Sequence, residues 1–262
     1  MRPVVVALGA VVAAVTVTAG AAPARAQIVN VQGSLARDPE PGWTSTLGAG
    51  VDWQTGNTEL ARLSGAASVL HRRGPWLALV LARGEYAEGR GVTLSKHTFA
   101  HLRGRRSLGR RLIWEAFVQH EYDAFRRLAL RGVAGTGPAV RLLTGPRVIM
   151  TAGAAYLLEL EERSTRVGAV DSGRHAWWHR LSTYLTGTVA LGAEVRATQT
   201  VYVQPRLDAP TDVTLLSETS LESKLAGRLS LTNSLVIAYD ASPPATVHAL
   251  STALKVGVNV TF

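Results

Sequence analysis

The sequence contains no cysteine. If the chain is exported to an oxidising compartment, its stability therefore comes from backbone pairing and packing and not from disulfide bonds. After the first 26 residues, no stretch approaches the ~20 apolar residues of a membrane-spanning helix. The sequence also has no Pro/Ser-rich tract, no block of like charge and no low-complexity run, so it predicts no linker between domains.

The first 26 residues have the organisation of an export signal. Arg2 provides a short positive region, residues 4–22 are mostly apolar, and the small residues of Ala24-Arg25-Ala26 precede Gln27. An uncleaved membrane anchor is the alternative, because this apolar stretch is nearly long enough to span a bilayer. The small residues at its end favour cleavage, so we expect residues 1–26 to be a signal peptide that is removed before Gln27.

The formal net charge is +9 at pH 7. A basic balance is found in many nucleic-acid-binding proteins. Here the arginines are dispersed along the chain and are not clustered with aromatic residues, and an exported protein rarely meets nucleic acid. We therefore expect no nucleic-acid partner.

Residues 247–262 alternate between larger apolar and small or polar side chains and end at Phe262. Successive side chains of a β-strand point to opposite faces, so this pattern predicts a strand with one apolar and one wet face. The same alternation recurs along the chain between turn signals. It predicts twelve strands, at about residues 43–53, 58–71, 76–86, 93–108, 112–123, 128–142, 147–159, 175–189, 193–204, 212–225, 228–240 and 247–262.

The prolines support these boundaries, because proline cannot donate a hydrogen bond to a sheet ladder. Those that fall before the first strand or in predicted turns are Pro39, Pro41, Pro75, Pro146, Pro205, Pro210, Pro243 and Pro244. Pro138 is the exception. It lies inside the sixth predicted strand beside Gly135 and Gly137, where we expect a bulge or a missing ladder bond.

Connections of two lengths alternate along the chain. The tight ones are residues 72–75, 109–110, 144–146, 191–192 and 226–227, and the mostly longer ones are 86–92, 123–127, 160–174, 205–210 and 240–246. A water-soluble sandwich has no reason to separate loop lengths in this way, whereas outer-membrane barrels have short periplasmic turns and longer extracellular loops. In lipid, a closed barrel also pairs every backbone group.

The sequence therefore predicts an all-β fold, an antiparallel up-and-down transmembrane β-barrel of about 12 strands in the bacterial outer membrane. The barrel domain is expected to cover residues 43–262, and ten or fourteen strands remain alternatives. Residues 27–42 are expected to be a periplasmic amino-terminal segment, which could add a short strand or a plug.

Aromatic residues near the strand ends on the outward-facing phase are expected to form the membrane-interface girdles of such a barrel. They are Trp43, Trp53, Trp76, Tyr86, Tyr122, Tyr239 and Phe262. The alternative is that they are scattered surface or core aromatics.

Charges of both signs fall on the inward-facing phase. The candidate pore-lining residues are Arg83, Glu115, Glu121, Arg131, Arg141, Arg147, Glu159, Arg180, Glu194, Arg196, Glu218, Glu222, Lys224, Arg228 and Lys255. They predict either a structural ion-pair network or a narrow water-filled pore, because twelve strands lie between the filled eight-stranded barrels and the open sixteen-stranded porins. A slight basic excess would favour small anionic solutes if water passes.

A lipid-active enzyme is the remaining alternative, and it needs a nucleophile with a histidine base in reach. None of the histidines lies in a nucleophile motif. His97 and His101, like His175 and His179, are spaced i, i+4, which on a strand is ~13 Å and too far to hold one metal ion. We therefore predict no enzyme, no catalytic residue, no metal and no cofactor.

Two short motifs carry a family resemblance. Gly56-Asn57-Thr58 follows the first strand, and the run from Glu121 to Arg131 contains Glu121, Tyr122, Asp123, Arg126, Leu128 and Arg131. They resemble the YdiY-like salt-induced outer-membrane protein family, whose domain has no known function. The resemblance covers about residues 43–143 and implies an outer-membrane barrel, but little about mechanism.

The carboxy-terminal Phe262 resembles the signature that the barrel-insertion machinery reads. We therefore expect this machinery as a partner of the last strand. Outer-membrane lipids are expected partners of the outer face, and lipopolysaccharide or a divalent ion is an alternative for the mixed charges of residues 160–174.

Overall fold

The computed structural model describes residues 28–35, 39–54, 60–124, 128–165, 172–243 and 248–262, and for residues 52–54 only the backbone. The expected signal peptide lies outside the described residues. Within the described part of the chain, no helix is long and apolar enough to cross a membrane.

Twelve β-strands follow one 3₁₀ turn, η1 (Gln32–Leu35). They are β1 (Gly42–Gln54), β2 (Leu60–Arg73), β3 (Trp76–Gly89), β4 (Val92–Ser107), β5 (Leu112–Asp123), β6 (Leu128–Thr144), β7 (Val148–Arg163), β8 (His175–Ala190), β9 (Val195–Pro205), β10 (Val213–Ala226), β11 (Leu229–Asp240) and β12 (Leu250–Thr261). The predicted strands are confirmed, with boundaries that differ by a few residues.

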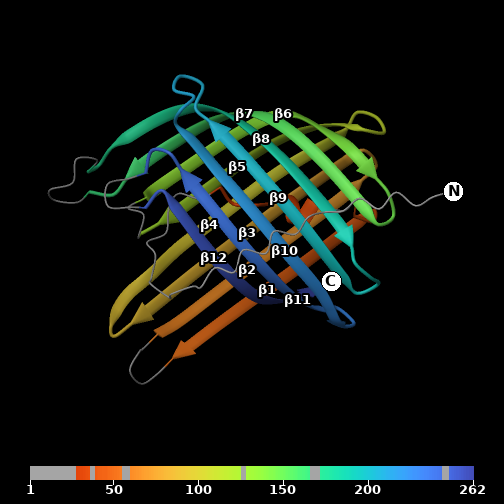
Figure 1. Cartoon of the computed structure of the whole chain (residues 1–262), viewed down its shortest axis with the longest axis horizontal. Coiled ribbons are helices and arrows are strands. Elements are labelled where there is room, and N and C mark those ends of the chain that lie inside the picture. Colours follow the sequence, from red (N-terminus) through yellow and green to blue (C-terminus); the bar gives the residue numbers. More distant parts are fainter. Residues whose placement is uncertain (1–27, 36–38, 55–59, 125–127, 166–171, 244–247) are drawn as a thin grey trace, which may run out of the picture.

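The strands form one closed antiparallel barrel in which each strand pairs with its neighbours in sequence and β1 pairs with β12. Figure 1 shows the strands crossing the barrel at a common tilt. The closing seam is short: Thr46–Ala49 pair with Val258–Thr261, whereas β11 and β12 pair along almost their whole length. Two hydrogen bonds between the backbones of Ser45 and Phe262 extend this seam. The predicted fold class is therefore confirmed.

Strand alternation separates a lipid-type outer face from a mostly polar interior. Large apolar side chains such as Leu47, Val80 and Leu102 point outward and are half exposed or more. The buried charged residues, in contrast, lie on the opposite phase and point into the lumen. The buried core of this molecule is therefore the inside of the barrel.

The connections differ between the two ends of the barrel. At one end, here called the turn end, they are residues 74–75, 108–111, 145–147, 191–194 and 227–228; at the other, the loop end, they include 164–174, 206–212 and 241–249. The prediction of a longer loop at residues 86–92 was wrong. Strands β3 and β4 continue to a tight turn in which Arg90 and Gly91 both have positive φ (51° and 71°), the geometry of a type I′ hairpin.

Pro138 lies inside β6, as the sequence predicts. The pairing of β6 with β7 passes from Thr136↔Tyr156 to Ala139↔Gly153 in one register and skips Gly137 and Pro138. As expected, the ladder is therefore interrupted at Pro138 on the β7 side. On the other side Pro138 is opposite Trp114 of β5.

The amino-terminal segment, defined here as residues 28–35, lies inside the barrel. Ile28 packs with lumen residues of β5, β6 and β8–β11, Val31 with Leu81 and Phe99, and Leu35 with Leu70 and Leu79. The expected periplasmic position therefore does not describe these residues. Their apolar side chains are buried against lumen side chains. This position matches the plug, which the sequence analysis gave as an alternative.

Candidate functional site

The lumen is the candidate site, and one wall of it carries a chain of buried ion pairs. Glu159 of β7 accepts from Arg131 of β6 at 2.6 Å and from Arg180 of β8 at 2.8 Å. Arg131 also reaches Glu121 of β5 at 3.3 Å, and Arg180 reaches Asp212 at 3.4 Å. We call Glu121, Arg131, Glu159, Arg180 and Asp212 the ion-pair chain.

All five residues of the ion-pair chain are less than a tenth exposed. Burying a single charge in a low-dielectric interior is costly, whereas alternating charges with several hydrogen bonds each offset that cost. The chain connects five neighbouring elements across the barrel. Each of its charges faces at least one opposite charge, so these residues are poor candidates for attracting a passing ion.

The ion-pair chain continues into the connection between β9 and β10. Arg206 contacts Asp212 at 2.9 Å and Asp208 at 2.6 Å, and its guanidinium lies 3.7 Å from the ring centre of Trp178. The hydrogen bonds from Arg206 hold the pKa of the exposed Asp208 carboxyl below its usual range. The ion pairs of the lumen wall therefore hold a loop at the loop end.

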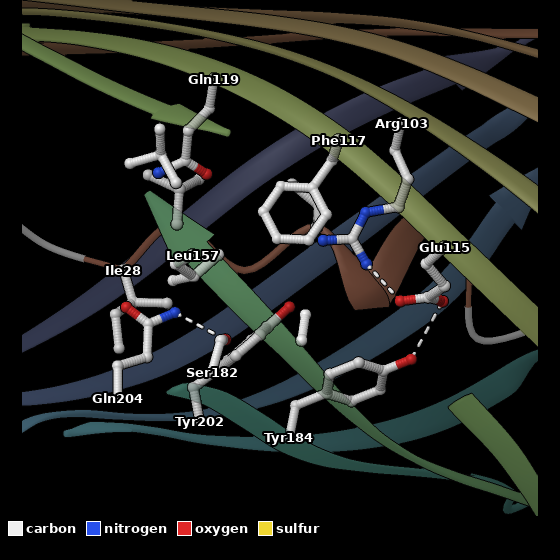
Figure 2. A pocket seen from close by; sticks show the side chains of 14 residues that line it. Ile28, Arg103, Glu115, Phe117, Gln119, Leu157, Ser182, Tyr184, Tyr202 and Gln204 are labelled. Carbon is white, nitrogen blue, oxygen red and sulfur yellow. Dashed lines mark hydrogen bonds and ion pairs between the residues drawn. The ribbon is translucent and has the colours of Figure 1, made fainter. Parts of the chain in front are cut away.

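A second buried cluster lies nearer the turn end of the lumen. Glu115 of β5 accepts from Arg103 of β4 and from the hydroxyl of Tyr184 of β8, each at 3.0 Å (Figure 2). Arg105 contacts the same carboxylate at 2.5 Å. Glu115 thus joins two arginines and a tyrosine from opposite parts of the chain.

The amino-terminal segment is attached to this second cluster. Arg105 donates to the side chain of Gln32, and Arg83 donates to the carbonyl of Asn30 at 3.3 Å. The cavity that remains beside the segment has a volume of about 20 Å³ and is lined by Phe117, Tyr202 and Gln204, among others (Figure 2). This is space for about one water molecule, so it cannot hold a solute.

Two inward-facing glycines make room for aromatic rings in this wall. A Cβ at Gly153 would collide with the ring of Tyr184, and one at Gly135 would collide with Phe117. The aromatic side chains that fill the lumen therefore depend on the absence of a side chain on the strands they cross.

The middle of the wall formed by β1 and β2 is different, because its inward-facing residues are small and partly exposed. We call this set the exposed strip; its members are Thr44, Thr46, Gly48 and Gly50 of β1 and Ser64, Ala66 and Ser68 of β2. By contrast, Phe99, His101, Arg103 and Arg105, on the inward face of β4, are all less than a tenth exposed. Water therefore reaches one side of the lumen and is excluded from the other.

The fifteen predicted pore-lining residues divide into four groups. Those buried in ion pairs are Glu115, Glu121, Arg131, Glu159 and Arg180. Those that face inward and are partly exposed are Arg83, Arg141, Arg196 and Glu218. Those that are on the inward phase and exposed are Glu222, Lys224 and Lys255. The structure therefore brings Glu121, Arg131, Glu159 and Arg180 together in the ion-pair chain and places Glu115 in the second cluster. Arg196 lies beside Glu222, and Lys224 beside Glu194.

The fourth group, Arg147, Glu194 and Arg228, does not line the lumen. All three are exposed and lie in turn-end connections rather than in strands. The alternating pattern predicted an inward direction for these side chains. That pattern applies only within a strand, and these three residues lie outside the strands. Arg228 instead lies over the ring of Phe262, at 5.6 Å from its centre.

The predicted aromatic residues lie at the two ends of the outer face. Trp43, Trp76 and Phe262 are at the turn end, and Tyr86, Tyr122 and Tyr239 are at the loop end. The side chain of Trp53 lies outside the described residues. Trp114 and Trp177, which are not among these seven, are also outward-facing and about half exposed.

Several lumen residues were missed by sequence reasoning. Arg103 and Arg105 share the inward phase with His101, but the basic run from Arg103 to Arg106 hides the alternation. Asp212, which ends the ion-pair chain, begins the predicted strand 212–225 and shares the even, inward phase of Glu218 and Glu222, but it was not selected; in the structure it lies just before β10.

Part of the family motif is brought together at the loop end. Glu121, Asp123, Leu128 and Arg131 are all buried, and Asp123 is opposite Leu128 in the β5–β6 pairing. Tyr122 points outward between them. Gly56, Asn57, Thr58 and Arg126 lie outside the described residues.

No group of three or more His, Asp or Glu residues that could hold a metal ion occurs in the described ranges. The two inward histidines of β4 have separate surroundings. His97 contacts Glu121 at 3.3 Å, whereas His101 lies between the rings of Phe99 and Phe117.

Comparison with known proteins supports the fold and the family. A family model described as "Protein of unknown function, DUF481" matches residues 47–262, in agreement with the resemblance seen in the sequence. No curated protein matches the chain.

Among solved structures, the NanC porin superposes with a TM-score of 0.51 at 6% identity, over 83% of this chain and 98% of that one. The KdgM porin has a TM-score of 0.43 at 7% identity, over 84% of this chain and 99% of that one. At such identities the likeness to NanC shows the fold alone.

Proposed function

The chain belongs to the DUF481 family of proteins of unknown function, and from this premise we propose that it is a narrow channel for small polar solutes in the bacterial outer membrane. The barrel fold resembles that of outer-membrane proteins. The turn end is then the periplasmic end and the loop end faces the cell exterior, because outer-membrane barrels have their short turns in the periplasm.

The exposed strip is the observation that carries this proposal. Along β1 it runs from Thr44, near the turn end, to Gly50, towards the loop end, and each inward position is partly exposed. The serine and threonine hydroxyls of the strip can hydrogen-bond to water, and its alanine and glycine positions add no large side chain. A barrel that served only as a closed structural element would gain stability by filling this wall as it fills the opposite one.

The amino-terminal segment explains why the channel would be narrow. It occupies part of the lumen and buries Ile28, Val31 and Leu35 against lumen side chains. Small ions and compact solutes are therefore the expected cargo, and large oligomers are not.

A mild preference for anions belongs to the same proposal. The buried arginines are neutralised in ion pairs, so selectivity would depend on exposed inward charges such as Lys224 and Lys255. A Lys255→Glu variant should move the reversal potential in a salt gradient towards cation preference. An unchanged reversal potential would exclude Lys255 from the ion path.

Planar-bilayer conductance of two single-residue variants tests the channel. Ala66 points into the exposed strip, whereas the next residue, Ala67, points outward. Ala66→Trp should lower the conductance several-fold by filling the strip, and Ala67→Trp should leave it unchanged. Equal conductance of both variants and the native chain, or no conductance in any of them, would refute the proposal.

A closed structural barrel is the second candidate, and the ion-pair chain together with the amino-terminal segment favours it. These features make the larger part of the lumen dry. The same conductance measurement separates the two candidates, because a closed barrel gives no current steps.

A lipid-active enzyme remains the weakest alternative. The lumen histidines His97 and His101 are occupied by Glu121 and by aromatic rings, and no nucleophile lies beside them among the contacts described above. Phospholipid turnover by the purified protein, retained after all histidines are replaced, would rule out a histidine-based mechanism.

The partners proposed from the sequence follow from this location. Lipids would contact the outer face, lipopolysaccharide or a divalent ion the charged loop-end residues, and the insertion machinery the strand β12 that leads to Phe262. Cleavage of the signal peptide before Gln27 belongs to the same proposal, and amino-terminal sequencing of the membrane-inserted protein would test it.

A further inference from the structure

Four neighbouring strands present an unusual row of side chains on the outer face at the turn end. Arg73 of β2 is the register partner of Trp76 of β3, Trp76 is the partner of Arg106 of β4, and Arg106 is the partner of Trp114 of β5. All four side chains are exposed. We call them the arginine–tryptophan row.

Contacts within the row hold it at a defined level. The guanidinium of Arg106 lies 5.1 Å from the ring centre of Trp76, and the indole of Trp114 donates to the hydroxyl of Thr136 at 3.0 Å. Tryptophan in membrane proteins rests at the headgroup level of the bilayer. The two arginines are therefore placed where lipid phosphate groups lie.

The charge around the row is of one sign. The adjoining connection between β4 and β5 adds the exposed Arg110 and Arg111, and residues 72–76 and 105–112 contain no acidic residue. The nearest acid along the chain is Glu115, which is buried in the lumen with Arg103 and Arg105. Its charge is already compensated there, so the row keeps an uncompensated positive field.

In the opposite part of the turn end, two basic residues lie beside acidic ones. There Lys224 lies 3.9 Å from Glu194, and Arg196 lies 3.5 Å from Glu222. If basic residues only extended towards the membrane interface in a general way, they would be distributed equally in the two sectors. The clustering of arginine and tryptophan on β2–β5 therefore indicates a specific ligand.

We propose that the arginine–tryptophan row, with Arg110 and Arg111, binds the phosphate group of an anionic phospholipid in the leaflet at the turn end. Guanidinium groups match phosphate oxygens in bidentate geometry. The tryptophan rings would cover the glycerol and upper acyl region of the same lipid. This site is on the outer face and does not depend on whether the lumen conducts.

Spin-labelled lipids measure this preference directly. The native protein, reconstituted in phosphatidylcholine vesicles, should immobilise spin-labelled phosphatidylglycerol more than spin-labelled phosphatidylcholine. In an Arg73→Gln, Arg106→Gln variant that preference should fall by roughly tenfold, since each basic residue near an anionic surface adds to lipid attraction. Adding Arg110→Gln and Arg111→Gln should remove it.

The matched control is an Arg147→Gln, Arg228→Gln variant, which removes the same charge from exposed turn-end connections outside the row and should keep the preference. Equal losses in both double variants would show a general charge effect and overturn the proposal, as would a preference that survives in the quadruple variant. Heat-dependent gel mobility confirms that each variant is folded. Unchanged conductance separates failure of this site from failure of the proposed channel.

Discussion

Glu159 illustrates how much depends on single residues within the lumen. Its carboxylate accepts from both Arg131 and Arg180, and all three groups are buried. Removing one member of such a network leaves an uncompensated charge, which makes a buried ion pair expensive to break even where forming it contributes little net stability.

We therefore expect Glu159→Ala to lower the free energy of unfolding by about 3–5 kcal/mol. Urea unfolding in lipid vesicles would measure it. Glu162 of the same strand serves as the control, because it is partly exposed and its ion-pair partner is the exposed His175, and Glu162→Ala should stay within about 0.5 kcal/mol. A small effect at Glu159 would mean that water reaches the ion-pair chain.

The pair formed by Asp208 and Arg206 predicts a dependence on pH. Hydrogen bonds from Arg206 lower the pKa of Asp208, so its stabilising effect is fully present above the pKa of the unfolded chain, about 3.9. It is lost as the pH falls through the lower pKa of the folded state. Asp208→Asn should therefore lower the melting temperature at pH 7 but not at pH 2, as thermal scans at both values would show. An equal effect at both values would contradict this linkage.

At the scale of elements, the amino-terminal segment is the part that most changes the lumen. It adds no strand to the barrel, but it places three apolar side chains in the interior, each of which contributes about 1.5–3 kcal/mol when fully buried. Its backbone is also held by Arg83 and Arg105. These contacts of the amino-terminal segment can be removed by substitution without disrupting the strand pairing of the barrel.

Val31→Asp combined with Leu35→Asp should expel the segment and raise the single-channel conductance several-fold, because two charges cannot remain among apolar side chains. Ser34→Asp is the control, since Ser34 is exposed between them and its charge stays in water. If conductance does not change when both buried positions carry aspartate, the segment does not limit the passage.

The strands themselves were predictable because alternation is a local property. Each strand of the barrel has one lipid-type and one lumen face, so the pattern repeats with every turn of the chain. The turn between β3 and β4 was misjudged because Glu88 and Gly89 have the composition of a loop, although the ladder continues through them to the Arg90-Gly91 turn.

At the scale of the whole molecule, closure of the sheet is the property on which the others depend. A closed barrel leaves few backbone groups unpaired, and this makes it resistant to detergent. The short β1–β12 seam is the weakest part of the ring, because only Ser45–Ala49 and Val258–Phe262 are paired there.

We expect the folded protein to keep its barrel in sodium dodecyl sulfate at room temperature and to migrate differently after boiling. Gel electrophoresis of heated and unheated samples measures this. Val51→Pro lies beyond the part of β1 that pairs across the seam in the described structure, whereas Leu47→Pro lies within the paired seam. Leu47→Pro should lower the temperature of the mobility change more than Val51→Pro; the reverse order would place the weak part of the ring elsewhere.

The sequence by itself determined the twelve strands, the face of most side chains within them and the unequal connections at the two ends. These follow from a two-residue period and from turn residues, which are read along the chain. It could not determine which lumen charges are buried in pairs, or that residues 28–35 lie among them.

Only the tertiary structure decided these points, because closure brings together groups that are far apart in sequence. Arg105 meets Gln32 over 73 residues, and Glu115 meets Tyr184 over 69. The balance of charge and volume inside a barrel is a sum over all its strands and the segment within it, and no single strand contains that information.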